Sequence, residues 1–347
     1  MTSIQTDSRP LVVRSLGYVW PPLALAALLL VAIFFSLGIG AVAISPAEVW
    51  AALQTPGSTS TAIQTIVLDF RLARALLVAL TGAGLAGAGA AFQGLFRNPL
   101  ADPFVIGASS GAALGATLAI ILGWTVSWAG FGPVPLAAFG GALLAVGLAY
   151  SISELSGQVT TLTLLLAGTA LSSFFSAGVS LLMVLNDHDV AKVFFWLLGS
   201  FSGRSWSDLG VALPYVLIGL LGLELLARPL DMLAFGEETA QGLGVSVRQI
   251  RLLIVLAAAL ATAAAVASSG IIGFVGLIAP HIARLLWGPV HARLLPTSAL
   301  LGALLLVLAD TAARTVLAPV ELPVGILTAL LGAPFFLYLL RARREML

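Results

Sequence analysis

Few side chains in this chain have the types and spacing that catalysis requires. A histidine can act as the base for a serine nucleophile, and His281 with Ser109 or Ser110 is the pair to consider. No carboxylate stands out as a third member, and a histidine directly after a proline more often ends or packs a helix. The other two histidines, His188 and His291, fall in loops. A hydrolase is therefore a remote alternative, and we assign no catalytic residue.

The chain also lacks the usual residues for binding nucleotides or thiolate-bound metals. The chain has no cysteine, which excludes disulfides and thiolate metal sites. Its single lysine, Lys192, stands between Ala191 and Val193, whereas a phosphate-binding P-loop ends in Gly-Lys-Ser or Gly-Lys-Thr. We expect no metal site and no cofactor on this chain, so that any driving ATP and Mg belong to a partner chain. The net charge of +1 argues against a nucleic-acid partner.

The composition places these residues in a lipid bilayer. The chain is 60% hydrophobic and 9% charged, with a mean hydropathy of +1.09, whereas soluble domains carry roughly 25% charged residues. Apolar stretches near the ~20 residues that cross a bilayer recur between prolines, glycines and charges. They predict an all-α polytopic membrane protein with about ten transmembrane helices, at 22–43, 76–96, 107–126, 134–152, 162–185, 209–227, 252–268, 271–287, 294–309 and 323–340.

Two stretches allow another interpretation. The run 22–43 ends like a signal-peptide cleavage site, but it exceeds the ~7–15 residues of a signal core, so we interpret it as a retained first helix. The stretch 252–287 has almost no loop at its centre and could form one long kinked helix. We expect a tail at 1–21, a single permease domain at 22–340 and a second tail at 341–347.

The distribution of basic residues predicts the orientation, because cytoplasmic loops of membrane proteins are enriched in lysine and arginine. With ten spans, both termini lie on the same side. That side carries eleven basic residues, namely Arg9, Arg14, Arg97, Arg228, Arg248, Arg251, Arg284, Arg293, Arg341, Arg343 and Arg344. The opposite side carries five, namely Arg71, Arg74, Lys192, Arg204 and Arg314. Both termini are therefore expected in the cytoplasm.

Two of the expected helices are rich in small residues, one over 82–91 and the other over 257–270. Small side chains allow helix backbones to approach closely in lipid, so both helices should be central and packed by protein. Their spacing of about half the chain also hints at two structural repeats.

Charged residues at the outer ends of helices suggest a docking surface. Arg71 and Arg74 share one helix face, and Asp310 and Arg314 are spaced to share another. They could form an outward cationic patch for an acidic partner. The alternatives are interfacial snorkelling for the first pair and a local ion pair for the second. The outer segment 192–206, which contains Trp196 and glycines, is either an aromatic belt or a lining of the pathway.

Two polar segments are expected on the cytoplasmic side. In the first, Asn98 and Asp102 can satisfy backbone groups of a proline-framed turn. In the second, 233–246, the glycines Gly236 and Gly244 can bracket a short helix. An amphipathic helix on this face suits docking to a soluble partner, and a plain loop is the alternative.

Four long motifs carry a resemblance to a known family. They are RLARALLVALTGAGLAGAGAAFQGLFRNPLADPFVIGASSG at 71–111, LAFGEETAQGLGV at 233–245, GIIGFVGLIAPHIARLL at 270–286 and ADTAARTVLAPVELPVGILTALLGAPFFLYLL at 309–340. In type, order and spacing they resemble the FecCD-type permeases, the membrane subunits of importers for ferric siderophores, haem and vitamin B12. The similarity extends from about residue 65 to the end.

The resemblance implies a type II ABC importer permease in a bacterial inner membrane. Such a subunit has ten helices, pairs with a second permease subunit (a homodimer here), binds two cytoplasmic ABC ATPases and receives its cargo from a periplasmic or lipid-anchored binding protein. The positions that match docking arginines are Arg71, Arg74 and Arg314. The segment that resembles ATPase-coupling helices contains Phe235, Gly236, Glu237, Ala240, Leu243 and Gly244. The positions that match the cytoplasmic gate are Asn98, Leu100, Thr161 and Leu162.

The cargo stays open at this stage. Leu162 replaces a small polar gate residue of the vitamin B12 permease, which argues against vitamin B12. We favour a ferric siderophore because iron chelates are the commonest cargo of the family that the chain resembles, with vitamin B12 or haem as alternatives. A more distant alternative is an ion-coupled secondary transporter, which usually carries ionisable groups within the membrane. Glu224 is the only carboxylate clearly inside an expected span.

Overall fold

The structure is a computed structural model that describes residues 11–54, 59–128, 130–155, 157 and 159–344. Within these residues the chain is helical and contains no β-strand. The α-helices are α1 (Leu11–Gly38), α2 (Pro46–Gln54), α3 (Thr61–Gln64), α4 (Ala73–Leu95), α5 (Ala108–Ile121), α6 (Pro133–Leu155), α7 (Thr161–Leu185), α8 (Val190–Leu197), α9 (Trp206–Leu225), α10 (Ala227–Ala234), α11 (Glu237–Gly242), α12 (Val247–Ser269), α13 (Val275–Trp287), α14 (His291–Ala313) and α15 (Val324–Arg344). A π-helical segment, η1 (Thr65–Leu72), joins α3 to α4, and a 3₁₀ turn, η2 (Asp187–Asp189), precedes α8.

Ten apolar helical segments correspond one to one with the ten predicted spans. Six are long and apolar enough to cross a membrane, namely Thr61–Leu95, Pro133–Leu155, Thr161–Leu185, Trp206–Leu225, Val247–Ser269 and His291–Ala313. Four are shorter, namely Pro22–Gly38, Ala108–Ile121, Val275–Trp287 and Val324–Leu337. The predicted all-α polytopic fold is confirmed.

Two predicted spans belong to longer helices. α1 begins at Leu11, ahead of the predicted start of the first span at residue 22, because the mostly apolar stretch before the two prolines continues the same helix. α12 begins at Val247, so Arg248 and Arg251 lie in its first turns and not in a loop. α12 and α13 are separate helices, since Gly270 and Phe274 both take positive φ angles between them. The alternative of one long kinked helix is therefore excluded.

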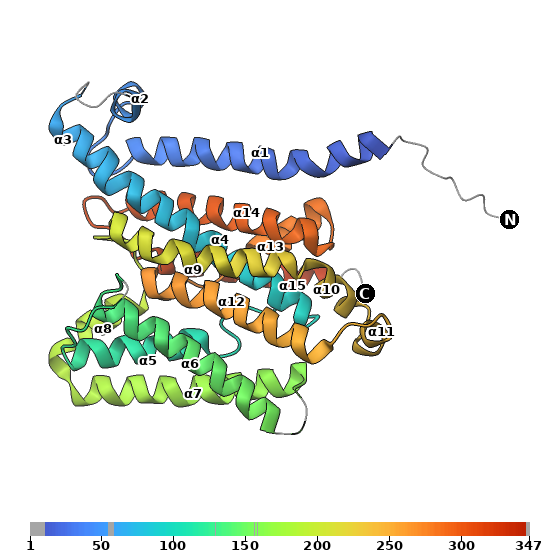
Figure 1. Cartoon of the computed structure of the whole chain (residues 1–347). Coiled ribbons are helices and arrows are strands. Elements are labelled where there is room, and N and C mark those ends of the chain that lie inside the picture. Colours follow the sequence, from blue (N-terminus) through green and yellow to red (C-terminus); the bar gives the residue numbers. More distant parts are fainter. Residues whose placement is uncertain (1–10, 55–58, 129, 156, 158, 345–347) are drawn as a thin grey trace.

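The helices run between two ends of the molecule (Figure 1). The start of α1, the end of α15 and the helices α10 and α11 gather at one end, which we call the α11 end. The helices α2, α3 and α8 gather at the other, which we call the α8 end. Both described chain ends thus lie on one side, as ten spans require.

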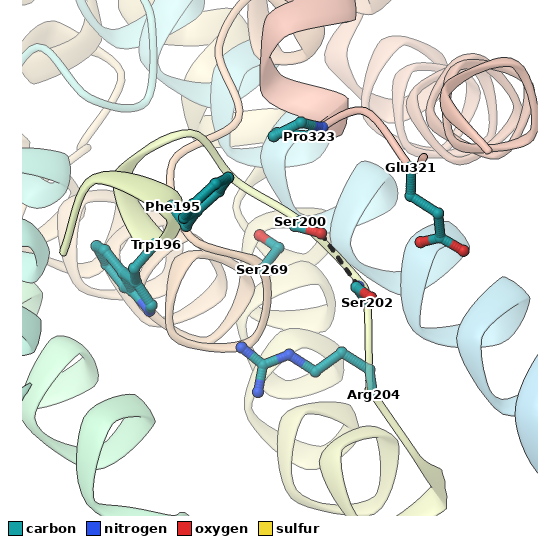
Figure 2. Close-up of a pocket in the computed structure, with 8 residues that line it drawn as sticks. All are labelled: Phe195, Trp196, Ser200, Ser202, Arg204, Ser269, Glu321 and Pro323. Carbon is teal, nitrogen blue, oxygen red and sulfur yellow. Dashed lines mark hydrogen bonds between the residues drawn. The ribbon is translucent and has the colours of Figure 1, made fainter. Parts of the chain in front are cut away.

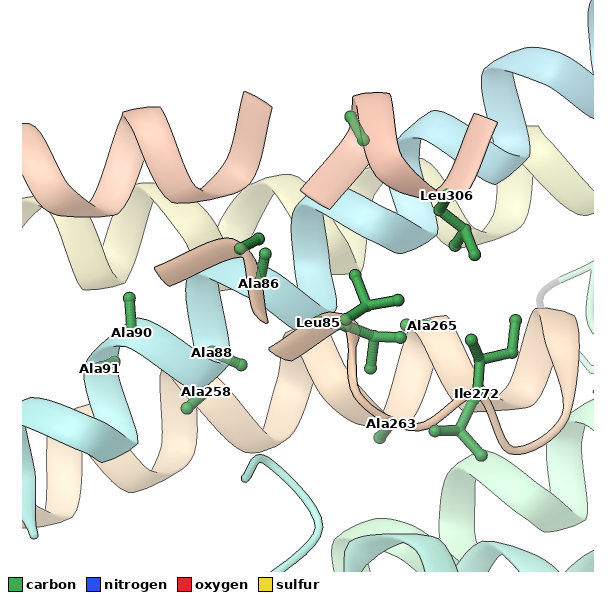
Figure 3. Close-up of a cluster of buried hydrophobic side chains, with 14 of the residues drawn as sticks. Leu85, Ala86, Ala88, Ala90, Ala91, Ala258, Ala263, Ala265, Ile272 and Leu306 are labelled. Atoms are coloured by element: carbon green, nitrogen blue, oxygen red, sulfur yellow. The ribbon is translucent and has the colours of Figure 1, made fainter. Parts of the chain in front are cut away.

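The core surrounds α4, and its packing depends on small residues. In the most apolar part of Thr61–Leu95, 89% of the residues are buried inside the protein, against 67% for α12 and 17% for α7. Figure 3 shows Leu85 and Ala88 of α4 close to alanines of α12. The small-residue helices are therefore central, as predicted.

Glycine is required where α4 meets two other helices. A Cβ atom added to Gly82 would overlap the carbonyl oxygen of Gly302 on α14. A Cβ atom added to Gly89 would overlap the carbonyl oxygen of Gly276 on α13. These contacts bring backbone against backbone and define how closely α4, α13 and α14 approach.

Candidate functional site

Two of the three arginines predicted to face outward, Arg74 and Arg314, meet one buried carboxylate at the α8 end. Nη2 of Arg74 lies 2.9 Å from Oδ1 of Asp310, and Nε of Arg314 lies 3.3 Å from Oδ2 of the same residue. The Asp310 side chain is only 3% exposed, and those of Arg74 and Arg314 are 12% and 7% exposed. The structure thus contains the local Asp310–Arg314 ion pair that the sequence left as an alternative. Glu321, on the segment before α15, accepts a hydrogen bond from Nη1 of Arg74 at 2.8 Å.

Arg71 and Arg314 hold the C-terminal end of α1. Arg71 donates from Nη1 to the carbonyl oxygen of Leu37 and from Nη2 to that of Val42, both at 2.6 Å. Arg314 donates from Nη1 to the carbonyl oxygen of Ile39 at 3.2 Å. These carbonyls follow the last turn of a helix or belong to it, where backbone acceptors lack helical partners. All three arginines therefore make internal contacts, and those of Arg71 and Arg314 tie the end of α1 to η1 and to the end of α14.

A pocket of about 410 Å³ opens next to this arginine cluster. Its lining combines aromatic, hydroxyl and charged side chains, drawn in Figure 2, namely Phe195, Trp196, Ser200, Ser202, Arg204, Ser269, Glu321 and Pro323. They come from α8, the segment after it, the end of α12 and the segment before α15.

We call this pocket the outer pocket, after the side on which the sequence predicts it. Two hydrogen-bond donors of its lining side chains have no partner among the described residues. Arg204 uses Nη1 to bind Oδ1 of Asp208 at 3.1 Å. Among the described residues, Nε of Arg204 and Nε1 of Trp196 are buried without a hydrogen-bond partner. Buried polar groups are normally satisfied, so these two N–H groups lack the partners that such groups usually have, in side chains that line the pocket.

The α11 end carries the predicted coupling segment, and the predicted short helix is present as α11. It begins after Gly236, whose φ is 122°, and the chain leaves it through Gly244, whose φ is 84°. Ala240 faces inward and is fully buried, whereas Phe235 is 80% exposed and Leu243 is 64% exposed. Two large apolar side chains therefore flank a short helix at this end, and the presence of the helix excludes the plain-loop alternative.

The predicted gate residues lie on two elements that both reach the α11 end (Figure 1). Asn98 follows α4, and its side-chain oxygen accepts a hydrogen bond from the backbone N–H of Leu100 at 3.0 Å. Thr161 and Leu162 open α7, and the Leu162 side chain is exposed. The asparagine thus shapes the turn as predicted, and the leucines present apolar surface.

The residue that the sequence did not single out is Arg251 on α12. Nη2 of Arg251 lies 2.5 Å from Oε1 of Glu237 on α11, and Nη1 donates to the carbonyl oxygen of Val159 just before α7. From sequence this arginine counted only as a cytoplasmic positive charge. The sequence offered one signal for its ion pair: Arg251 lies three residues after Arg248, on a helix that follows the two glutamates Glu237 and Glu238. A similar buried polar contact joins Arg284 of α13 to Gln93 of α4 at 2.9 Å.

The hydrolase pair has other contacts in the structure. The Ser110 hydroxyl donates to the carbonyl oxygen of Gly107 at 3.0 Å, at the start of α5. The ring of His281 lies edge-on to Phe335, with centroids 6.3 Å apart. These contacts agree with the interpretation that both residues pack or terminate helices and do not form a catalytic pair.

Two curated relatives match most of the chain. The cobalamin import system permease protein BtuC of Halobacterium salinarum is 49% identical over 280 residues, which cover 81% of this chain and 74% of the relative. The Fe(3+)-citrate import system permease protein YfmE of Bacillus subtilis is 42% identical over 328 residues, which cover 93% and 96%.

A solved structure has the same fold. It is an inward-facing conformation of a protein assigned to the metal-chelate type of ABC transporters, with a TM-score of 0.81 and 35% identity, covering 92% of this chain and 98% of that chain. The model of the FecCD transport family matches residues 28–342. With the family match extending over nearly all the described helices, the chain belongs to the FecCD transport family of ABC importer permeases.

Proposed function

We propose that this permease forms the membrane pathway of an importer that carries a metal chelate, with a ferric siderophore as the preferred cargo. ATP and Mg are bound by partner ATPases, and their energy drives alternating access of the pathway. The observation that carries this proposal is the family match over 28–342, together with the fold shared with a metal-chelate type transporter.

The outer pocket supports an oxygen-rich chelate. Metal chelates present carboxylate, hydroxamate or amide oxygens at their surface, and the side chains of Arg204 and Trp196 in the pocket lining carry complementary N–H donors. The rings of Phe195 and Trp196 offer flat apolar surface beside them (Figure 2). Such contacts are few and non-covalent, which suits a conduit that must release what it admits. Vitamin B12 and haem remain alternative cargoes in the same importer class.

The arginine cluster supports docking of the binding protein through an exchange of ion-pair partners. We propose that an acidic side chain of the binding protein replaces Glu321 at Arg74, because Glu321 is the most exposed carboxylate of the cluster. The substitution Glu321→Gln would leave Arg74 without that competitor. Binding-protein affinity should then rise at low salt, and an unchanged affinity would argue against docking at Arg74.

The α11 end supports attachment of the ATPase. Phe235 and Leu243 expose apolar surface on either side of a short helix, as a segment that fits into a groove of a partner would. Deleting 235–244 should release the ATPase from the purified complex, and an intact complex would refute this assignment. The end that carries α11 is then cytoplasmic, and both termini with it, in a bacterial inner membrane.

A second copy of the chain is the proposed partner within the membrane. α7 is the least buried of the six long spans, and it carries Thr161 and Leu162 of the proposed gate at its start. Pairing of two such faces would place two gates opposite each other.

The experiment that tests the proposed function is uptake in a deletion strain, with labelled ferric siderophore, haem and cobalamin offered side by side. Loss of one cargo alone would confirm the importer class and identify the chelate. Uptake that survives collapse of the proton gradient but fails on ATP depletion would exclude the ion-coupled transporter. Unchanged uptake of all three, in a strain without a redundant system, would refute the proposal.

A further inference from the structure

Arg251 is a buried cation whose two guanidinium arms contact two different segments at the α11 end. The whole residue is only 5% exposed. One arm reaches Glu237, the first residue of α11, and the other reaches the carbonyl oxygen of Val159. The fork of an arginine is planar and rigid, so its two partners are held at a defined separation.

The Val159 contact leads directly to the first turn of α7. The next residue, Thr160, caps this helix, because its side chain accepts from the backbone N–H of Thr163 at 3.1 Å. The Thr163 hydroxyl in turn accepts from the backbone N–H of Thr160 at 2.9 Å and lies 2.5 Å from the hydroxyl of Ser153 on α6. A displacement of the Val159 carbonyl is therefore transmitted to the helix start that carries Leu162.

The Glu237 contact leads to the exposed part of the coupling segment. Glu237 follows Gly236 and begins α11, which is anchored by the fully buried Ala240. Phe235 and Leu243 flank the helix on its exposed side. A partner that moves these side chains would move Glu237 with them.

A cavity lies between the two segments that Arg251 contacts. The space is about 440 Å³ and is lined by α11, the start of α12, the end of α6 and the segment before α7, through Glu154, Gly157, Val159, Thr160, Glu237, Gln241, Val247, Arg248 and Arg251. Arg251 lines this cavity together with both of its partners, Glu237 and Val159. Polar contacts across such a space can transmit movement while leaving room for it.

We infer that Arg251 is a positioning residue that couples the ATPase-facing helix α11 to the gate at the start of α7. This inference rests on the proposed function, because it assumes that α11 contacts the ATPase and that α7 carries the gate. It goes beyond that function by assigning the connection to one side chain and two contacts.

The chain offers a matched control on the same helix. Arg248 lies one turn before Arg251 and pairs with Glu154 at the end of α6, so it also links α12 to a neighbour. Its side chain is 75% exposed and that of its partner 44%, so this pair is hydrated and contributes little. Loss of the Arg248 charge should therefore leave coupling intact.

The test compares Arg251→Met with Arg248→Met in the complete importer, reconstituted in proteoliposomes with its binding protein and ATPase. Methionine retains much of the apolar stem of arginine and removes both contacts. We expect Arg251→Met to retain basal ATP hydrolysis but to lower the amount of chelate imported per ATP hydrolysed by about fivefold or more. Arg248→Met should match the wild type.

A second variant keeps the test independent of folding. Glu237→Ala removes only the α11 contact, at a side chain that is 42% exposed, and leaves Arg251 bound to the Val159 carbonyl. It should uncouple import in the same way, and Arg251→Lys, which retains the charge but not the fork, should recover part of the ratio. An unchanged import ratio in Glu237→Ala, or equal losses in Arg251→Met and Arg248→Met, would overturn the inference. Failure of the proposed function would look different, because the wild-type importer itself would then move no chelate.

Discussion

Asp310 should be the residue on which the α8 end of the protein depends most for stability. Its carboxylate is the shared anion between Arg74 and Arg314, and all three side chains are nearly or fully buried. Replacing it with asparagine retains the size of the side chain and one acceptor oxygen but removes the charge. Two guanidinium groups would then repel each other without their common counter-ion.

The expected cost follows from the burial of the cluster. Removing one partner of a buried ion pair destabilises proteins by about 3–5 kcal/mol, because an uncompensated charge is left inside. Glu321 still neutralises part of the Arg74 charge at 2.8 Å, so we expect a value near the lower limit, about 3 kcal/mol, which corresponds to roughly a hundredfold change in the unfolding equilibrium.

The assay is denaturation of the purified permease in detergent, with Glu321→Gln as the control. Glu321 is 39% exposed, and loss of an exposed ion pair costs about 0–1 kcal/mol. Combining Asp310→Asn with Arg314→Met should restore part of the lost stability, because one of the two unpaired cations is then absent. Equal stability of Asp310→Asn and Glu321→Gln would refute the assignment of Asp310 as the shared counter-ion.

Three further predictions address the turn, the outer pocket and the core. Burial raises the pKa of Asp102 from 3.8 to about 6, against the opposing effect of the Phe104 N–H. The folded state therefore retains this proton while the unfolded state releases it, so the free energy of unfolding falls as pH rises between about 4 and 6. Asp102→Asn should be more stable than the wild type at pH 7 by up to ~3 kcal/mol but not at pH 4, as measured by denaturation at both pH values. Arg204→Gln should reduce uptake of an anionic ferric chelate more than that of a neutral one, whereas Lys192→Gln, which changes an exposed outer cation, should affect neither; equal losses for both chelates would argue against an oxygen-binding pocket. Gly89→Ala should destabilise the protein by about 1–3 kcal/mol through overpacking, whereas Gly147→Ala, where a Cβ meets nothing within 4 Å, should melt like the wild type.

The sequence by itself determined the membrane class, the ten spans and the central helices, because these depend on local properties. Hydropathy over about 20 residues marks a span, and the density of small residues at 82–91 marks a helix that protein must surround. The short helix between Gly236 and Gly244 was likewise predictable, since glycine at both ends is a local signal for starting and ending a helix. Family motifs added the expected roles of the outer arginines, the coupling segment and the gate.

Only the tertiary structure decided which charges meet. Arg74 and Asp310 are 236 positions apart in the chain, and Arg251 and Val159 are 92 apart. No periodicity or local propensity connects such pairs, since their contact results from how the helices pack around α4. The structure therefore showed that the outer arginines are held by internal partners and that one arginine of α12 joins α11 to the start of α7. Side-chain type and spacing indicated where charges lie along each helix, whereas the packing of the helices determined which of these charges lie within hydrogen-bonding distance of each other.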